Sequence, residues 1–135
     1  MREAIKDINR LAHMLDAIKV IQDRTSGMTL DSLMEDKIVY GGIVYYTMIF
    51  GEAAYMLAKE FKDAHPATPW RQIEGMRHHI VHGYFQVRED MLWNVIQKDL
   101  QPLKEQLLKY MDEKDSNSDR LPEAYDERRP APASE

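Results

Sequence analysis

Apolar residues recur at steps of three and four along most of the chain, which is the spacing of one face of a helix. In residues 2–24 they alternate with Lys, Asp and Arg, and they are Ile5, Ile8, Leu11, Ala12, Leu15, Ile18 and Ile21. We therefore predict an amphipathic first helix over this range. The Thr-Ser-Gly stretch at 25–27 ends it, and Thr29 or Asp31 can cap a short helical turn that extends through Met34.

A second apolar repeat predicts a long helix from about Asp36 to Lys62. Its apolar positions surround much of the helix, so contacts on two sides are expected; they are Ile38, Val39, Ile43, Val44, Met48, Ile49, Ala53, Met56 and Leu57. Gly41 and Gly42 each cost about 1 kcal/mol relative to Ala in a helix interior, and close packing of another helix would account for them. The β-branched and aromatic run 38–50 also suits a strand, but no turn signal makes a hairpin of it.

The next segment contains the signals of a helix start. Thr68 is suited to the N-cap and Pro69 to the first helical position. The third helix should then run to about His82, and Gly83 can end it in a left-handed conformation.

A fourth helix is predicted over residues 88–98, where the inward positions are Met91, Leu92, Val95 and Ile96. Pro102 breaks or kinks this helix because proline lacks the backbone N–H and its ring clashes with the preceding turn. A last helical segment continues the pattern, and its apolar positions are Leu103, Leu107, Leu108 and Met111.

From residue 113 onward the apolar repeat stops, and the remaining residues are polar and include prolines. Such a segment is expected to be disordered. We therefore divide the chain into a helical domain, residues 1–112, and a polar C-terminal tail, residues 113–135. A chain of 135 residues suffices for one hydrophobic core. The predicted fold is all-α, an up-and-down bundle of four to five helices.

The composition suits a helical globular protein, with 44% hydrophobic and 30% charged residues and only six Gly and six Pro. The absence of Cys excludes disulfides, thiolate metal sites and cysteine nucleophiles. Charged residues are spread through the first twenty positions, which lack the apolar stretch of a signal peptide or membrane span. We expect a cytoplasmic protein that does not enter the membrane.

The formal net charge of −5 argues against binding of nucleic acid through broad neutralisation of phosphates. The charge is unevenly distributed, because residues 113–135 contain seven acidic and four basic residues. The helical domain is thus closer to neutral than the whole chain. It can hold a local basic site, above all where a dimer brings two copies of that site together.

Residues 70–85, WRQIEGMRHHIVHGYF, combine Arg, three His and Tyr near one helix end. Arg77 and His82 are five positions apart, which places them about 140° apart around a helix, so they do not line one stripe. His82 lies at the predicted helix end, however, where the chain can turn its imidazole and Tyr84 towards Arg77 or towards a partner subunit.

These residue types suit cleavage of RNA by its own 2′-hydroxyl. That reaction needs a base, an acid and cationic stabilisation of the phosphate, and no metal is obligatory. Histidine serves as acid or base near its ordinary pKa of about 6.5, and a guanidinium matches two phosphate oxygens. Each subunit contributes one such histidine, His82. A symmetric dimer that places both copies in one cleft can therefore supply a separate acid and base.

Residues 77–84, Arg-x4-His-Gly-Tyr, resemble the Arg-x4-His-x-Tyr motif of the HepT-type toxins in the HEPN family. Residues 49–54, Ile-Phe-Gly-Glu-Ala-Ala, resemble the Ile-Gly-Glu-Ala segment of that family. Residues 69–77 resemble its Pro-Trp…Ile-x-Gly-Met-Arg run. The resemblance covers about residues 1–111, and the combination of motifs is more specific than a lone Arg-x4-His.

The resemblance implies a HEPN-like bundle that cleaves RNA, with Arg77 and His82 as the catalytic pair and with no cofactor or metal. His78 stands where the family often has Asn, and we expect it to contact RNA or to orient the site. The family also implies a homodimer whose motifs face a shared cleft. A partner nucleotidyltransferase antitoxin of the MNT type would transfer AMP to the motif tyrosine, Tyr84. Adenylate beside His82 adds bulk and negative charge that repel RNA phosphate.

Other interpretations of the same residues remain open. Arg77 can form a surface ion pair with Glu74, His82 can merely cap a helix C-terminus, and Tyr84 can be an ordinary residue at the core edge. Glu74, His78 and His82 recur every four residues and could bind a divalent metal, although no HExxH motif is present.

The second predicted helix contains tyrosines that can either stack on RNA bases or pack against other helices. They are Tyr40, Tyr45, Tyr46 and Tyr55. Glycine-rich phosphate loops and serine-hydrolase signatures are absent from the sequence. The alternative function is that of a non-catalytic HEPN protein that binds and regulates a nucleotidyltransferase partner or a nucleotide.

Overall fold

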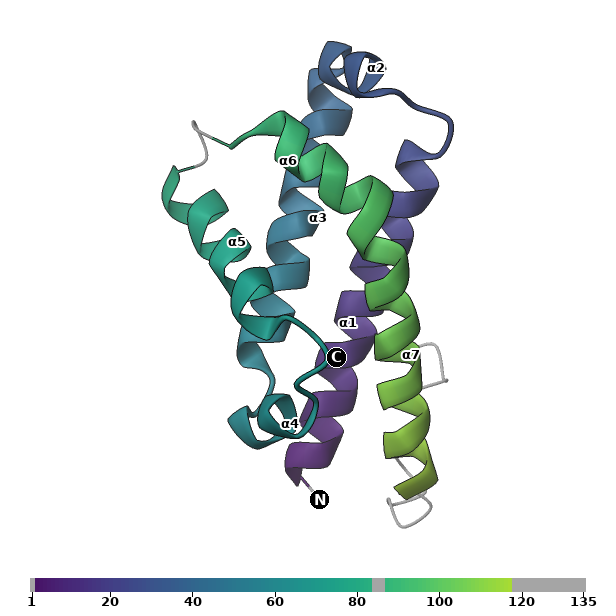
Figure 1. Ribbon diagram of the computed structural model, residues 1–135, viewed down its shortest axis with the longest axis vertical. Coiled ribbons are helices and arrows are strands. Elements are labelled where there is room, and N and C mark those ends of the chain that lie inside the picture. Colours follow the sequence, from purple (N-terminus) through teal and green to yellow (C-terminus); the bar gives the residue numbers. More distant parts are fainter. Residues whose placement is uncertain (1, 84–86, 118–135) are drawn as a thin grey trace.

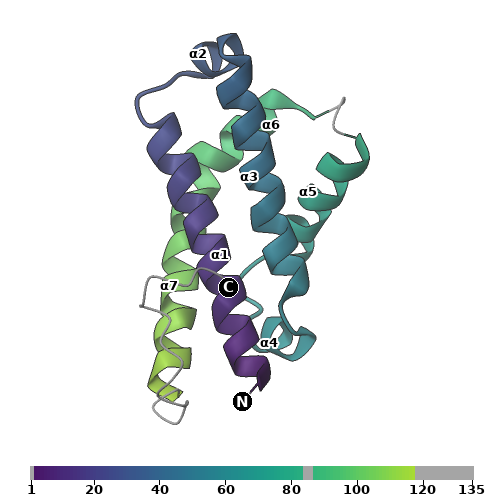
Figure 2. The same ribbon diagram turned by 180° about the vertical axis from the view of Figure 1, so that it is seen from behind.

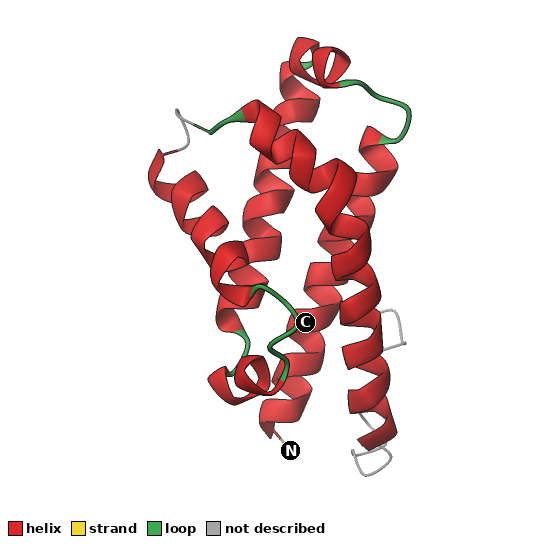
Figure 3. Cartoon of the chain, in the orientation of Figure 1, coloured by secondary structure: helices red, strands yellow, loops and turns green. Residues whose placement is uncertain are grey.

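The computed structural model describes residues 2–83 and 87–117, and every regular element in these ranges is a helix (Figure 3). The elements are α1 (Arg2–Thr25), α2 (Leu30–Glu35), α3 (Lys37–Met56), α4 (Lys59–Ala64), α5 (Trp70–Gly83), α6 (Glu89–Asn94), the π-helical turn η2 (Val95–Asp99) and α7 (Leu100–Asn117). The all-α prediction is confirmed. None of these described helices has the length and apolar content that crossing a membrane requires.

The four longer helices alternate in direction, as in an up-and-down bundle (Figure 1). Helix α1 leads upward in this view, α3 returns, α5 leads upward again, and α6 continues into the descending α7. Seen from behind, α1 and α3 lie side by side, with α7 beyond α1 and α5 beyond α3 (Figure 2). The contacts agree, because α1 packs on α3 and α7, and α3 packs on α5. Helix α5 is thus an outer helix supported by α3.

The core lies where α1, α3 and α7 meet. Its largest fully buried side chains are Phe50, Ile8, Leu11, Met14, Ile18, Ile21, Leu33, Ile43 and Leu107. Burying each such side chain contributes roughly 1.5–3 kcal/mol relative to exposure. The predicted inner face of the first helix and the two-sided contacts of the second helix are both confirmed.

The connection from α1 to α3 follows the predicted capping. Gly27 has a φ of +80° and lies just after the end of α1. The Thr29 hydroxyl accepts from the Ser32 backbone N–H at 3.0 Å, and the Ser32 hydroxyl accepts from the Thr29 N–H at 2.9 Å. This reciprocal pair starts α2, and the Asp36 carboxylate then caps α3 by accepting from the Val39 N–H at 3.1 Å.

The helix that the sequence predicts to continue to Lys62 ends at Met56. Leu57 and Ala58 have an extended backbone, with ψ of 147° and 142°. Neither residue breaks helices by its own preference, so the interruption has a tertiary cause. The Ala58 N–H donates to the buried Asp7 carboxylate at 3.1 Å, and Leu57 is buried in the core. The prediction was wrong because these contacts come from another helix.

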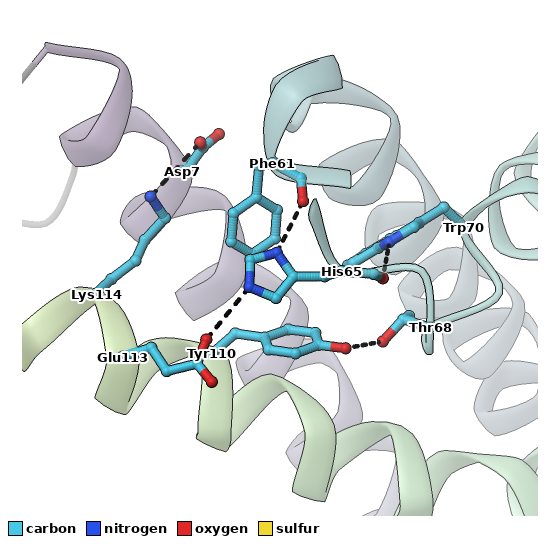
Figure 4. Close-up of polar contacts among 8 residues, drawn as sticks. All are labelled: Asp7, Phe61, His65, Thr68, Trp70, Tyr110, Glu113 and Lys114. Carbon is cyan, nitrogen blue, oxygen red and sulfur yellow. Dashed lines mark hydrogen bonds and ion pairs between the residues drawn. The ribbon is translucent and has the colours of Figure 1, made fainter. Parts of the chain in front are cut away.

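An aromatic cluster holds the connection between α4 and α5 against α7 (Figure 4). The centroid of the His65 ring lies 4.2 Å from that of Phe61 and 4.3 Å from that of Tyr110. His65 Nδ1 lies 2.8 Å from the Phe61 carbonyl oxygen, and its Nε2 lies 3.2 Å from Glu113 Oε1. Trp70 Nε1 donates to the His65 carbonyl at 2.9 Å. These contacts fix the first turn of α5.

Thr68 does not cap α5 with its side chain, contrary to the prediction. Its buried hydroxyl donates to Gln106 Oε1 at 2.6 Å and accepts from the Tyr110 hydroxyl at 2.6 Å. Pro69 precedes the first helical residue, and its carbonyl accepts from the Ile73 N–H at 3.1 Å. The contacts with α7 therefore take the place of the cap.

Of two further predictions about helix ends, the one at Gly83 is wrong, and the break or kink predicted at Pro102 is a bend without a break. Gly83 is helical and has no left-handed conformation, because glycine permits that conformation without requiring it. Pro102 lies in the first turn of α7, directly after η2. The Leu100 N–H donates to the Val95 carbonyl, and this wider π turn lets the chain bend between α6 and α7 without a break (Figure 1).

Two apolar residues predicted to face the core are exposed instead. Met91 is 56% exposed and Leu108 is 46% exposed, whereas Leu92 and Leu107 beside them are buried. Successive helical residues point about 100° apart, so each pair can place only one member at the centre of the inner face.

Helix α7 continues past residue 113 as far as Asn117. Glu113 contacts His65, and Lys114 Nζ lies 3.8 Å from Asp7 Oδ2. Residues 118–135, the larger part of the predicted tail, lie outside the described residues. The division of the chain at residue 112 therefore stays a prediction.

Helix α5 packs closely on α3 at Gly51. A Cβ atom on Gly51 would overlap the Cβ of Arg77 and would lie 3.2 Å from the Ile73 carbonyl oxygen. Gly41 and Gly42 have open space at the corresponding position. The prediction of close helix packing at Gly41 and Gly42 is therefore wrong within this chain, because the close contact lies farther along α3.

We expect Gly51→Ala to lower the free energy of unfolding by about 1–2 kcal/mol, since overpacking costs about 1–3 kcal/mol and exceeds the gain in helix propensity. Chemical denaturation measures this change. Gly41→Ala is the matched control, because it makes the same substitution in α3 with open space around the new methyl group. It should stabilise the protein by up to about 1 kcal/mol. Equal effects of the two substitutions would contradict close packing at Gly51.

Candidate functional site

Helix α5 has a buried side and an exposed side. The candidate histidines are exposed, and the Arg77 side chain is partly buried. The buried side chains are Trp70, Ile73 and Ile80. The exposed histidines are His78, His79 and His82. His82 lies in the last turn of α5. The predicted extent of this helix to about His82 is confirmed.

The Arg77 side chain is held against α3. Arg77 Nε donates to Glu52 Oε1 at 2.7 Å, and the guanidinium carbon lies 4.9 Å from the centroid of the Tyr55 ring. The Arg77 side chain is 24% exposed and that of Glu52 is 46% exposed. Glu74 is not the ionic partner of Arg77, because its carboxylate pairs with Lys62 at 2.8 Å. The alternative prediction of an ion pair at Arg77 is thus confirmed, but its acid is Glu52 and not Glu74.

The rings of His78 and His82 lie next to each other, with centroids 4.5 Å apart and planes inclined by 46°. Their spacing of four residues places them on one flank of α5. Arg77 makes no hydrogen bond with His82 in the described part of the chain. One chain therefore brings the two histidines together, while Arg77 is anchored separately on α3.

This combination of fold and motif coincides with a known family. A family model described as "Ribonuclease HepT-like" matches residues 14–110, which include the α3 contact with Arg77 and all of α5. The chain belongs to the HepT-like ribonuclease family. It is a HepT-type HEPN protein, as the sequence resemblance predicts.

Curated HepT-like relatives agree with the assignment. A Methanocaldococcus jannaschii protein named "Gamma-glutamylcyclotransferase and putative RNase" is 34% identical, over 79% of this chain and 48% of its own length. A "Putative RNase" of Caldanaerobacter subterraneus subsp. tengcongensis is 32% identical, over 72% of this chain and 87% of its own. "Probable ribonuclease HepT" of Thermococcus cleftensis is 31% identical, over 77% and 93%. No solved structure matches the chain significantly.

This chain thus spans about half the length of the first of these relatives and most of the other two. The names of all three relatives include a "putative RNase" or "probable ribonuclease", in agreement with the description of the family. They support a ribonuclease-type HEPN protein as the class of this HepT-like chain.

The remaining predicted site residues have different outcomes. Tyr84 lies outside the described residues. The metal hypothesis required Glu74, His78 and His82 together, and the Glu74 carboxylate is bound to Lys62. Within the described ranges, the structure holds no group of three or more His, Asp or Glu side chains arranged for a metal ion.

The α3 residues that contact Arg77, Glu52 and Tyr55, were not predicted from the sequence as site residues. Glu52 belongs to the Gly-Glu segment on which the family resemblance partly rested, and that segment was the available signal. Tyr55 was assigned to packing or base stacking, but it is 52% exposed and contacts the guanidinium of Arg77. Tyr40 and Tyr46 do pack against the core.

A pocket of about 230 Å³ lies between α5, η2 and α7. Gln72, Met76 and Asp99 are among its lining residues, and the lining includes neither Arg77 nor the histidines of α5. The candidate catalytic residues of this HepT-like chain are therefore on the surface of α5 and not in this pocket.

Proposed function

We propose that the protein is the toxin of a toxin–antitoxin pair and a metal-independent endoribonuclease, with Arg77 and His82 as its catalytic residues. The proposal rests chiefly on one observation in a HepT-like ribonuclease chain. Helix α5 presents the exposed His82 beside His78, on the same helix as Arg77, whose side chain is 24% exposed. Acid–base and phosphate-binding groups are thereby combined on one surface element.

The proposed reaction transfers the phosphate within the RNA. The 2′-oxygen attacks the adjacent phosphorus, and the bond from phosphorus to the 5′-oxygen breaks. A base takes the proton from the 2′-hydroxyl, and an acid gives a proton to the leaving 5′-oxygen. His82 performs one of these proton transfers. Arg77 stabilises the negative charge on the phosphate oxygens as it increases, and the products carry 2′,3′-cyclic phosphate and 5′-hydroxyl ends.

We assign His78 to orienting His82 or contacting the RNA. Its ring lies one helical turn before that of His82, with the centroids 4.5 Å apart. It can therefore limit the rotation of the His82 ring or donate a hydrogen bond to a phosphate oxygen.

A homodimer would place two copies of His82 in one cleft, so that one serves as base and the other as acid. The surface near Arg77 supports this assembly. Tyr45, Tyr55 and Met56 on α3 are 53%, 52% and 48% exposed, and Val81 on α5 is 40% exposed. Exposed aromatic and apolar side chains are enriched at protein interfaces, and Gly41 leaves open space on the same helix.

Purified wild type expressed without a nucleotidyltransferase should cleave RNA in the presence of EDTA, and His82→Ala should lower the rate by at least about 100-fold, since general acid–base catalysis contributes about 10²–10⁴-fold. Gel analysis of RNA fragments and their end groups measures the reaction. His79→Ala is the matched control, because His79 is also exposed on α5 but occupies a variable position of the Arg-x4-His motif.

Failure of the unmodified, folded wild type to cleave diverse RNAs would favour the alternative, a non-catalytic protein that regulates its nucleotidyltransferase partner. Cleavage that EDTA abolishes would contradict the metal-independent mechanism. Retention of full activity by His82→Ala would remove His82 from the reaction.

Sedimentation or light scattering should give twice the chain mass of 15.8 kDa, and Tyr45→Glu should convert the dimer into monomer, because a charge buried at an apolar interface is costly. Leu108→Glu is the matched control: Leu108 is comparably exposed, at 46%, but belongs to α7. Dissociation by both substitutions, or by neither, would contradict a dimer formed through α3.

We further propose that a nucleotidyltransferase antitoxin neutralises the toxin by transferring AMP to Tyr84. Tyr84 follows His82 by two positions in the sequence, so the transferred phosphate would add negative charge near the imidazole. RNA phosphates would then be repelled from the site.

Incubation with the cognate transferase and ATP should add about 329 Da, the mass of one AMP moiety, or a multiple of it, per chain. Tyr84→Phe should abolish the gain in intact mass spectrometry. Tyr45→Phe, at an exposed tyrosine of α3, should leave it unchanged. Persistence of the gain in Tyr84→Phe would place the modification on another residue.

A further inference from the structure

The carboxylate of Glu52 binds one particular edge of the Arg77 guanidinium. Arginine has five N–H bonds, one on Nε and two on each Nη nitrogen. The Nε–H donates to Glu52 at 2.7 Å, and within the described residues the guanidinium makes no other hydrogen bond. The Nη groups therefore remain available for the two oxygens of a phosphate.

Two further contacts restrict the same side chain. The Tyr55 ring lies 4.9 Å from the guanidinium carbon, a distance at which a cation is attracted to an aromatic face. At the other end of the side chain, the Arg77 Cβ lies against Gly51, where no Cβ could be accommodated. Contacts at the base, at Nε and at the guanidinium face together favour one orientation of a side chain that is otherwise flexible.

The charge of Glu52 is unfavourable for a protein that binds RNA. A carboxylate beside the arginine opposes the approach of phosphate by Coulomb repulsion, and the Glu52 side chain is 46% exposed. An exposed ion pair also contributes little to stability. The position of Glu52 is thus explained better by the orientation of Arg77 than by affinity for RNA or by stability of the fold.

We propose that Glu52 is a positioning residue of the ribonuclease site, which holds Arg77 at Nε so that both Nη groups face the scissile phosphate. This inference rests on the proposed function. Glu52 does not touch the RNA. It acts through Arg77, and its contribution appears in the chemical step and not in RNA binding.

The test compares Glu52→Ala and Glu52→Gln with wild type in single-turnover RNA cleavage. Glu52→Ala should lower the cleavage rate about tenfold, since small displacements of a catalytic group reduce rates strongly. Glu52→Gln should lose less, because its amide oxygen can still accept the Nε–H. Affinity for RNA with a 2′-deoxy nucleotide at the cleavage position should stay equal or increase, because a repelling charge is removed.

Glu74→Gln is the matched control. This substitution also removes one negative charge, but it does so on α5, one turn before Arg77. The Glu74 carboxylate binds Lys62 and not Arg77. Its cleavage rate should stay within about twofold of wild type, as expected for a change that leaves the orientation of Arg77 intact. An equal loss in Glu74→Gln would attribute the effect to general charge and overturn the proposal.

A second readout does not depend on activity. The Arg77 Nε–H should give a ¹H–¹⁵N signal protected from solvent exchange, which is identified by its absence in Arg77→Lys and is lost in Glu52→Ala.

A third test uses the cleavage rate of a double variant. In the Arg77→Lys background, which lacks Nε, Glu52→Ala should change the cleavage rate less than about twofold, because the two residues act as a unit.

The two proposals fail in different ways. No cleavage by wild type would overturn the proposed function, and the catalytic role of Glu52 with it. Cleavage that is as fast in Glu52→Ala as in wild type would overturn the Glu52 proposal alone, and so would persistence of the protected Nε–H signal in that variant.

Discussion

The contact between α3 and α5 at Gly51 determines where the candidate site can form. Helix α5 is an outer helix that packs on α3, and the absence of a Cβ at Gly51 lets the Arg77 backbone approach α3 closely. The next residue, Glu52, can then reach Arg77 Nε, and Tyr55 one turn later can reach the guanidinium. A larger residue at Gly51 would displace α5 and all three contacts together.

The rest of the bundle supports this contact through the first turn of α5 and through α3. The aromatic cluster around His65 and the Thr68 hydroxyl fix the first turn of α5 against α7. Helix α3 is itself held by the core that it shares with α1. Arg77 is supported at the base of its side chain, and the histidines of α5 are exposed. Exposed side chains of this kind are accessible to an extended polymer. The family assignment and this geometry support the same proposed chemistry through independent observations.

Predictions from the sequence were most accurate where local preferences act alone. The cap of α2 at Thr29 and the start of α3 just after Asp36 follow from side chains within four positions of the groups they bind. Predictions were wrong where a distant residue competes for the same group. The Asp7 carboxylate accepts the Ala58 N–H, and α3 ends just before that residue, at Met56. Tyr110 and Gln106 bind the hydroxyl of Thr68 that would otherwise cap α5.

The sequence by itself determined the helical class, the extent of α5 and the membership of the HepT-like family. Periodicity and short motifs encode these properties, because they depend on neighbouring positions. Only the tertiary structure decided that Arg77 pairs with Glu52 and not with Glu74, and that α5 approaches α3 closely at Gly51. These choices depend on how closely two helices approach, and that distance is set by packing between residues far apart in the chain.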